Sequence, residues 1–231
     1  MYRLHYAPDN ASLIVRLVLE EMGQPHECVL VDRSAGAQNS PDYLALNPLG
    51  LIPVLETPDG PMFETGAILL WLADRHGVMA PAPQSPGRAA FLKWLFFLSN
   101  GLHTDLRQLF YSDQYAGSDA GCRTSHSALT QGRVRRNLAL LDEQVEASHS
   151  WLGATDPSVI DYYLATCLRW LALYPKGHCD WFDLSMTPAL ARFARALEGR
   201  PAVHSAIHAE GLGPAPFSHP KYARPAKGSA T

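Results

Sequence analysis

Cysteine is scarce in this sequence, and no two cysteines lie close together. The four that are present, Cys28, Cys122, Cys167 and Cys179, are too far apart to form a C-x-x-C motif or a zinc knuckle. This spacing argues against a cysteine metal site and against a dithiol that exchanges disulfides. We therefore expect reduced thiols, mostly buried as small apolar side chains, and no bound metal.

Long apolar runs and clusters of one charge are also missing. No stretch approaches the roughly eighteen apolar residues of a membrane span, and the opening MYRLHYAPDN lacks the apolar core and cleavage site of a signal peptide. Lysine and arginine are spread along the chain, and the formal net charge is -3. These features argue against a nucleic-acid or anionic-membrane partner, and they predict a soluble, cytoplasmic protein.

The chain of 231 residues divides into two unlike parts. Within residues 1–77, strand and helix patterns follow the order βαβ and then ββα. The first helix has Asn10 as its predicted N-cap and Gly23 as its left-handed C-terminal residue. This order predicts a four-stranded mixed sheet with helices on its faces, and it resembles the thioredoxin-like fold.

Strand signals stop after residue 77. Residues 78–86, VMAPAPQSP, hold three prolines in nine positions and are typical of a linker. Residues 87–210 show helical patterns, among them a long helix over 87–111 and a capping box from Ser158 to Asp161, and they predict an all-helical bundle domain. Residues 211–231 are rich in proline and glycine, so we expect a tail that wraps the surface or stays loose. The predicted fold class is α/β plus all-α.

The most informative stretch runs from Asn47 to Arg75 and reads NPLGLIPVLETPDGPMFETGAILLWLADR. Pro53 stands directly before an apolar strand pattern, where it cannot donate to a sheet ladder. It suits an edge strand or a tight turn, including a cis peptide, and leaves neighbouring backbone groups free for a ligand. Glu64 and Thr65 then open a helix, whose unpaired N–H groups suit a carboxylate.

The order N-P-x-G-x-I-P-V-L, then D-G, then E-T-x-A-I-L-x-W-L-A resembles the glutathione-binding half of the glutathione transferase family. The resemblance implies that the backbone of Ile52, before a cis Pro53, binds the cysteinyl part of glutathione. It implies that Glu64 and Thr65 hold the γ-glutamyl carboxylate and amine. Glutathione would be the co-substrate, with no metal.

Glutathione bound in this way would place its sulfur at the end of the first strand and the first turn of the first helix. The candidate donors to a thiolate there are the Ser12 hydroxyl, the Asn10 amide and the Tyr6 phenol, ranked in that order. The nearest motif in the family is the Y-x-P-G-A-C-S of bacterial beta-type enzymes, matched at Tyr6, Pro8 and Ser12. Its cysteine is Ala11 here, which removes mixed-disulfide chemistry.

Other positions complete the expected site. His103 falls where beta-type enzymes carry a histidine that reaches the active site from the helical domain, so the resemblance implies that it is a glutathione-binding residue. Arg33, after the second strand, is the candidate cation for the glycine carboxylate of glutathione. Arg107, Phe110 and Tyr111 would form a wall for a hydrophobic electrophile. Several of these residues have a structural alternative: His103 as a packed core residue, Arg33 as solvated surface, and Asn10 and Ser12 as helix caps.

These features predict a glutathione transferase that conjugates or reduces small hydrophobic electrophiles or peroxides, as in detoxification. Ala11 in the place of cysteine keeps two alternatives open. One is a non-catalytic protein of the same fold that binds ligands or a protein partner, and the other is a glutathione-dependent disulfide reductase in which Asn10 orients the sulfur. Trp71, Phe91 and Phe97 lie on more than one helix face, which predicts a homodimer with twofold symmetry.

Overall fold

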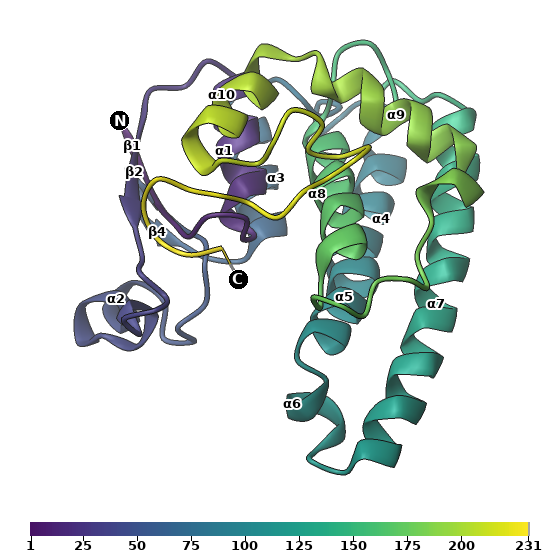
Figure 1. Ribbon diagram of the computed structural model, residues 1–231. Coiled ribbons are helices and arrows are strands. Elements are labelled where there is room, and N and C mark those ends of the chain that lie inside the picture. Colours follow the sequence, from purple (N-terminus) through teal and green to yellow (C-terminus); the bar gives the residue numbers. More distant parts are fainter. Residues whose placement is uncertain (231) are drawn as a thin grey trace.

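The computed structural model describes residues 1–230, in which an α/β part is followed by a group of helices (Figure 1). The last helix of the first part ends at His76, and the next helix begins at Arg88. The elements of the first part are β1 (Tyr2–Tyr6), α1 (Ser12–Glu21), β2 (His26–Leu30), η1 (Ala37–Asn39), α2 (Pro41–Leu46), β3 (Val54–Thr57), β4 (Gly60–Met62) and α3 (Thr65–His76).

The four strands form one mixed sheet in the order β2-β1-β3-β4. β1 pairs with β2 in parallel, and both the β1–β3 and β3–β4 pairs are antiparallel. Leu4 lies between Cys28 and Leu55 in this register and is fully buried. The thioredoxin-like arrangement predicted from the order of elements is therefore confirmed.

The turns of the first part follow from local chemistry. Gly23 ends α1 with a φ of +61°, a left-handed conformation that glycine adopts without steric cost, as predicted. The prediction of Asn10 as the N-cap is wrong by one residue. Helix α1 begins at Ser12 after Ala11, and no side chain caps it, because the Asn10 Oδ1 accepts the Ala11 N–H at 2.8 Å instead.

Helices form the regular structure of the second part among its described residues, apart from an isolated β-bridge between His149 and Leu152. The long helix predicted over 87–111 is interrupted by a π-helical turn, η2, a feature that often lies near functional sites. The elements are α4 (Arg88–Phe97), η2 (Leu98–Leu102), α5 (His103–Phe110), α6 (Ser112–Ala116), α7 (Ala120–Glu146), α8 (Val159–Leu173), η3 (Leu184–Met186), α9 (Pro188–Glu198) and α10 (Pro201–Glu210).

Helix α8 is the centre of the molecule, since nearly every residue in it is buried. The predicted capping box at its start is present: Ser158 Oγ accepts the Ile160 N–H at 3.1 Å, and Asp161 accepts the Ser158 N–H at 2.7 Å. Helix α1 packs against both α8 and α10, so one continuous apolar core joins the two parts of the chain.

The C-terminal segment packs firmly, and the alternative of a loose tail is wrong. Figure 1 shows it leaving α10, running toward α8 and returning to the strands. Leu212 and Phe217 are fully buried. Glu198 accepts the N–H groups of Phe217 and Ser218 at 2.8 and 2.7 Å. Leu212 and Phe217 therefore anchor the segment to the core, while most of its other residues lie on the surface.

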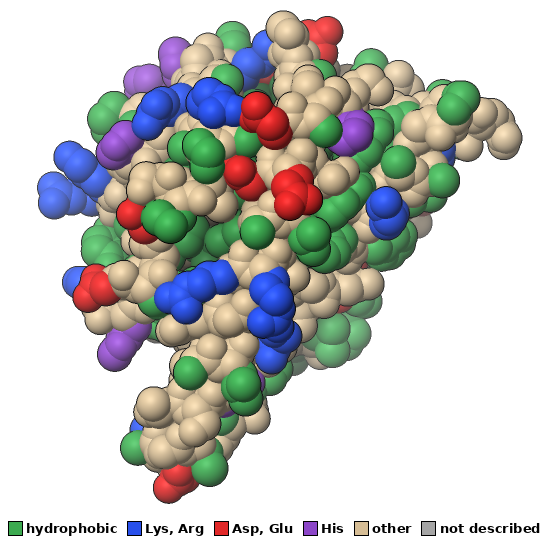
Figure 2. Space-filling model, turned by 90° about the vertical axis from the view of Figure 1, so that its right-hand side faces the viewer, with side chains coloured by type: hydrophobic (Ala, Val, Ile, Leu, Met, Phe, Trp, Pro, Cys, Tyr) green, Lys and Arg blue, Asp and Glu red, His purple; other side chains and the backbone are tan. Residues whose placement is uncertain are grey.

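The surface carries both charges. The face in Figure 2, on the α7 and α9 side, shows acidic and basic side chains among hydrophobic ones and narrows below to the tip where α6 meets α7. Among the described helices, none combines the length and apolar character needed to cross a bilayer.

The apolar surface predicted for a dimer differs at one position. Phe91 is fully buried, so it cannot form part of that surface. Phe96, also in α4, is 53% exposed.

Candidate functional site

A cavity of about 1040 Å³ lies between the two parts of the chain. From the first part it is lined by the loop before α1, the segment that precedes β3, and the start of α3. From the second part it is lined by η2, α5 and the end of α8. It is large enough for a tripeptide together with a small second molecule.

The segment before β3 presents unpaired backbone to this cavity. The Ile52–Pro53 peptide is cis, as expected. The carbonyl of Leu51 is held by the Tyr43 hydroxyl and the Asn47 amide, both at 2.8 Å. Since β3 begins only after Pro53, the N–H and C=O of Ile52 lie outside the ladder and bond no other described residue. A bound peptide can therefore pair with them.

The start of α3 forms a second recognition point. Thr65, the first residue of α3, is 7% exposed and lines the cavity, and its hydroxyl has no partner among the described residues. Glu64 before it has a φ of +72°, a left-handed conformation that costs a non-glycine residue about 1–3 kcal/mol and is common at ligand sites. The free N–H groups and dipole of the helix suit a carboxylate here.

The three predicted thiolate donors do not all reach the cavity. Asn10 lines it; because its Oδ1 accepts the Ala11 N–H, the group left for a ligand is its amide N–H donor. Ser12 is fully buried, donating its hydroxyl to the Ala7 carbonyl at 3.0 Å and accepting the Ala7 N–H at 3.3 Å. It does not line the cavity. Of these two residues, only Asn10 is therefore placed to reach a ligand in the cavity.

Tyr6 is also outside the cavity lining. Its ring packs under the Arg16 guanidinium, whose central carbon lies 4.8 Å from the ring centre. Burial raises the pKa of the Tyr6 phenol, and Arg16 only partly opposes this effect. The Tyr6 phenol therefore packs beside α1 in its protonated form and does not face the cavity.

His103, the residue directly after the π-helical turn, does reach the cavity. Its Nδ1 lies 2.9 Å from the Tyr163 hydroxyl, and its ring lies 5.3 Å from the Trp170 ring. Burial lowers the pKa of His103 to about 4, and the positive charge of Arg107 adds to the effect. The imidazole is therefore neutral near pH 7.

The predicted electrophile wall lines the cavity as well, with a cationic rim. Arg33 donates from Nη2 to the Tyr111 hydroxyl at 3.3 Å, which links the two parts of the chain. Arg107 lies over the Tyr111 ring at 5.4 Å and donates to the Tyr115 hydroxyl at 3.0 Å. Phe110 supplies apolar surface. The cavity therefore joins a polar end to an aromatic end.

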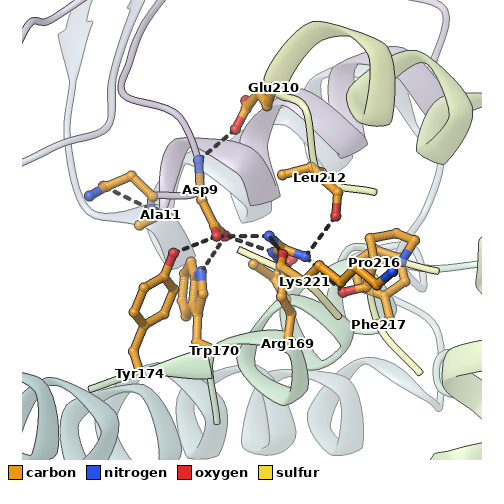
Figure 3. Close-up of polar contacts among 12 residues, drawn as sticks. Asp9, Ala11, Arg169, Trp170, Tyr174, Glu210, Leu212, Pro216, Phe217 and Lys221 are labelled. Atoms are coloured by element: carbon orange, nitrogen blue, oxygen red, sulfur yellow. Dashed lines mark hydrogen bonds and ion pairs between the residues drawn. The ribbon is translucent and has the colours of Figure 1, made fainter. Parts of the chain in front are cut away.

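The loop before α1 is held by a buried group of residues that was not predicted from the sequence. Asp9 is 1% exposed and accepts hydrogen bonds from Arg169, from Trp170 Nε1 at 3.2 Å and from the Tyr174 hydroxyl at 2.7 Å (Figure 3). Its own N–H donates to Glu210 at 2.8 Å. No motif marks these residues. The sequence offered two weaker signals: Asp9 stands next to the predicted start of α1, and Arg169 interrupts an apolar helical pattern.

Comparisons with known proteins agree with this geometry. Models of the N-terminal and C-terminal domains of glutathione S-transferases match residues 11–75 and 124–209. Glutathione S-transferase GST-4.5 of Xanthomonas campestris is 31% identical over 215 residues, covering 91% of this chain and 99% of the relative. The disulfide-bond oxidoreductase YfcG of Escherichia coli is 30% identical over 222 residues, covering 92% and 97%.

A solved structure gives the same result. The glutathione S-transferase of a sphingomonad, complexed with glutathione, is 33% identical with a TM-score of 0.73, covering 91% of this chain and all of that one. The fold and cavity define a protein with a thioredoxin-like domain and a helical domain that meet at a peptide-sized site. The chain belongs to the glutathione S-transferase family.

Proposed function

We propose that this protein binds glutathione as its thiolate and uses it to conjugate or reduce a small hydrophobic electrophile or peroxide. The observation that carries the proposal is that one cavity collects the unpaired backbone of Ile52, the start of α3 at Thr65 and the amide of Asn10. These groups match a peptide backbone, a carboxylate and a sulfur. The solved relative that carries glutathione supports the same ligand.

The proposed binding mode assigns one part of glutathione to each group. The γ-glutamyl carboxylate lies at the N-terminus of α3 beside Glu64 and Thr65. The cysteinyl backbone pairs with Ile52 next to the cis Pro53. Arg33, on the rim, binds the glycine carboxylate in place of its weak contact with the Tyr111 hydroxyl.

The chemistry requires a more acidic thiol. Lowering its pKa from about 8.5 to about 6.5 takes roughly 2.7 kcal/mol of preferential thiolate stabilisation. A hydrogen bond from the Asn10 amide and the positive end of α1 supply energy of this size. The thiolate then attacks the electrophilic carbon and expels its leaving group, or attacks a peroxide oxygen and expels an alkoxide that takes a proton from water. His103, Arg107, Phe110 and Tyr111 hold the second substrate.

A second candidate is glutathione-dependent disulfide reduction. Asn10 faces the cavity and Ala11 supplies no thiol, so any exchange must start from the glutathione sulfur. That thiolate attacks one sulfur of the substrate disulfide, forms a mixed disulfide and releases the other sulfur as a thiolate. The relative named as a disulfide-bond oxidoreductase favours this reaction as an alternative. Ala11 stands where the beta-type motif, to which the rest of this segment is most similar, has its cysteine. A non-catalytic protein that binds ligands therefore stays a third candidate.

Titration calorimetry with glutathione tests the proposal first. S-methylglutathione is the matched ligand, because its sulfur cannot ionise. We expect both to bind, and only glutathione to give the ultraviolet absorbance of a thiolate near pH 7. Absence of binding at millimolar glutathione would refute the proposal.

Activity assays separate the three candidates. A dinitrohalobenzene reports conjugation, an organic hydroperoxide reports peroxide reduction, and hydroxyethyl disulfide reports disulfide reduction. A protein that binds glutathione but shows none of these rates above background is a binder. We further propose that the protein is a cytoplasmic homodimer, with the exposed Phe96 and the partly exposed Trp71 and Phe97 near the shared surface.

A further inference from the structure

Arg169 joins the C-terminal tail to the loop that carries Asn10. Its side chain is fully buried, and all five of its N–H donors have acceptors (Figure 3). Two donate to the Asp9 carboxylate at 2.7 and 2.8 Å. The other three donate to main-chain carbonyls of the tail: Leu212 at 3.3 Å, Pro216 at 3.2 Å and Lys221 at 2.9 Å. The tail thus folds around a single guanidinium.

Asp9 is held as tightly from its other side. Its φ of +52° is left-handed, an arrangement that persists in a non-glycine residue only where the surroundings fix it. Glu210 provides one such restraint, because it accepts the Asp9 N–H and pairs with Arg16 at 2.8 Å. Both carboxylates are therefore paired with a buried arginine, and removal of either arginine would leave a buried charge without its partner.

The same carboxylate organises the cavity wall. Trp170 and Tyr174 donate to Asp9, and both line the cavity. His103 packs on the Trp170 ring. Asn10 directly follows Asp9, so the direction of its side chain depends on how Asp9 is held. These contacts connect the tail to both ends of the candidate site.

We propose that Arg169 is a positioning residue: by clamping Asp9 to the C-terminal tail, it sets where the Asn10 amide lies in the cavity and thereby the acidity of the bound thiol. This inference deepens the proposed function and rests on the role given there to Asn10. The tail then influences the site indirectly, through Arg169 and Asp9, and none of its residues needs to contact glutathione.

Two glycine variants of the full chain test the proposal: one should displace the tail, and the other should leave it in place. Gly211 and Gly213 have φ values of +66° and +84°, so alanine strains the backbone at both. At Gly211 the added Cβ would lie 2.1 Å from the Arg224 carbonyl oxygen, whereas at Gly213 its nearest neighbour would be Lys221 Cβ at 3.8 Å. Gly211→Ala should therefore push the tail away, and Gly213→Ala is the matched control.

Arg169→Lys tests the guanidinium directly. It keeps the positive charge, but an ammonium has three donors and lacks the planar fork that meets a carboxylate at two points. If this variant does not fold, the two glycine variants decide the question.

The first readout needs no glutathione. The side-chain amide resonances of Asn10, measured in ¹⁵N-labelled ligand-free protein, should shift in Gly211→Ala and Arg169→Lys and stay in place in Gly213→Ala. The second readout is the ultraviolet titration of bound glutathione. We expect the thiol pKa to rise by at least about 0.5 unit in the two disruptive variants, which is about threefold less thiolate below the pKa. Glutathione affinity should change little, because Ile52 and Thr65 are untouched.

Several results would overturn the inference. One is that folded Gly211→Ala and Arg169→Lys keep the wild-type Asn10 resonances, and another is that the resonances move but the thiol titrates as before. A third is that Gly213→Ala has the same effects as Gly211→Ala. If the wild-type protein binds no glutathione, the proposed function fails separately. A shift of the Asn10 resonances in Gly211→Ala alone would then still support coupling between tail and cavity.

Discussion

Replacing Asn10 by alanine should remove the side-chain donor to the bound thiolate and leave the fold intact. Its Oδ1 accepts the Ala11 N–H, the residue lines the cavity, and its amide N–H has no acceptor among the described residues. A hydrogen bond to a charged group is worth about 1.5–3 kcal/mol. At 1.36 kcal/mol for each pKa unit, its loss should raise the thiol pKa by about 1 to 2 units.

This shift has a clear kinetic consequence. A thiol of pKa about 6.5 is half ionised at pH 6.5, whereas one of pKa about 8 is roughly 3% ionised. Turnover of Asn10→Ala with a dinitrohalobenzene should thus fall about fifteen-fold at pH 6.5 and recover above pH 9. Asn10→Asp, of nearly equal size, should raise the thiol pKa at least as far, because its carboxylate repels the thiolate.

Ser12→Ala is the contrasting variant. Ser12 exchanges two hydrogen bonds with Ala7 and does not line the cavity. Its loss leaves buried backbone groups unpaired, so we expect about 1–3 kcal/mol less stability in urea unfolding and an unchanged thiol titration. An upward shift in Ser12→Ala together with none in Asn10→Ala would refute this assignment. No shift in either variant would leave the thiolate to backbone N–H groups and the dipole of α1.

Three further predictions test other parts of the site. Thr65→Ala should weaken glutathione binding in calorimetry by about 1–2 kcal/mol without moving the thiol pKa, since it removes a bond to the distant carboxylate; a shifted thiol titration would contradict the binding mode. Burial lowers the pKa of His103 from 6.5 to about 4, so between these two pH values the unfolded chain binds a proton at His103 that the folded protein does not bind. The free energy of unfolding should therefore fall as the pH drops from 6.5 to about 4. His103→Gln should flatten the decline in urea titrations, and an equal slope in both proteins would place the acid sensitivity elsewhere. Light scattering should give the mass of two chains at micromolar concentration, and the mass of one chain would refute the homodimer.

Much of the fold follows from local patterns. Alternation and helical spacing gave the βαβ and ββα order, because each element must bury one apolar face. The capping box from Ser158 and the left-handed Gly23 are local backbone chemistry that can be read from sequence. The π-helical turn before His103 was missed, since the apolar pattern over 87–111 predicts one continuous helix.

Asn10 and Ser12 differ in their access to the cavity for a geometric reason. Sequence places Asn10 and Ser12 equally well at the start of a helix, and both are favoured there. Each residue of a helix turns by about 100°, so a change of one or two residues in the starting position decides which side chain faces the cavity. The structure starts α1 at Ser12, and the hydroxyl of that residue turns back to Ala7.

The network around Asp9 was beyond local patterns for another reason. Asp9 and Arg169 are 160 positions apart, so no spacing rule connects them. In the proposed binding mode Ala11 places no functional group at the sulfur, so the Asn10 amide beside it must be aimed by its own backbone. That backbone is left-handed at Asp9 and is fixed by a buried arginine whose remaining donors close on the tail. Under the proposed role of Arg169, thiolate placement depends on residues near the opposite end of the chain, and the folded tail is part of that arrangement.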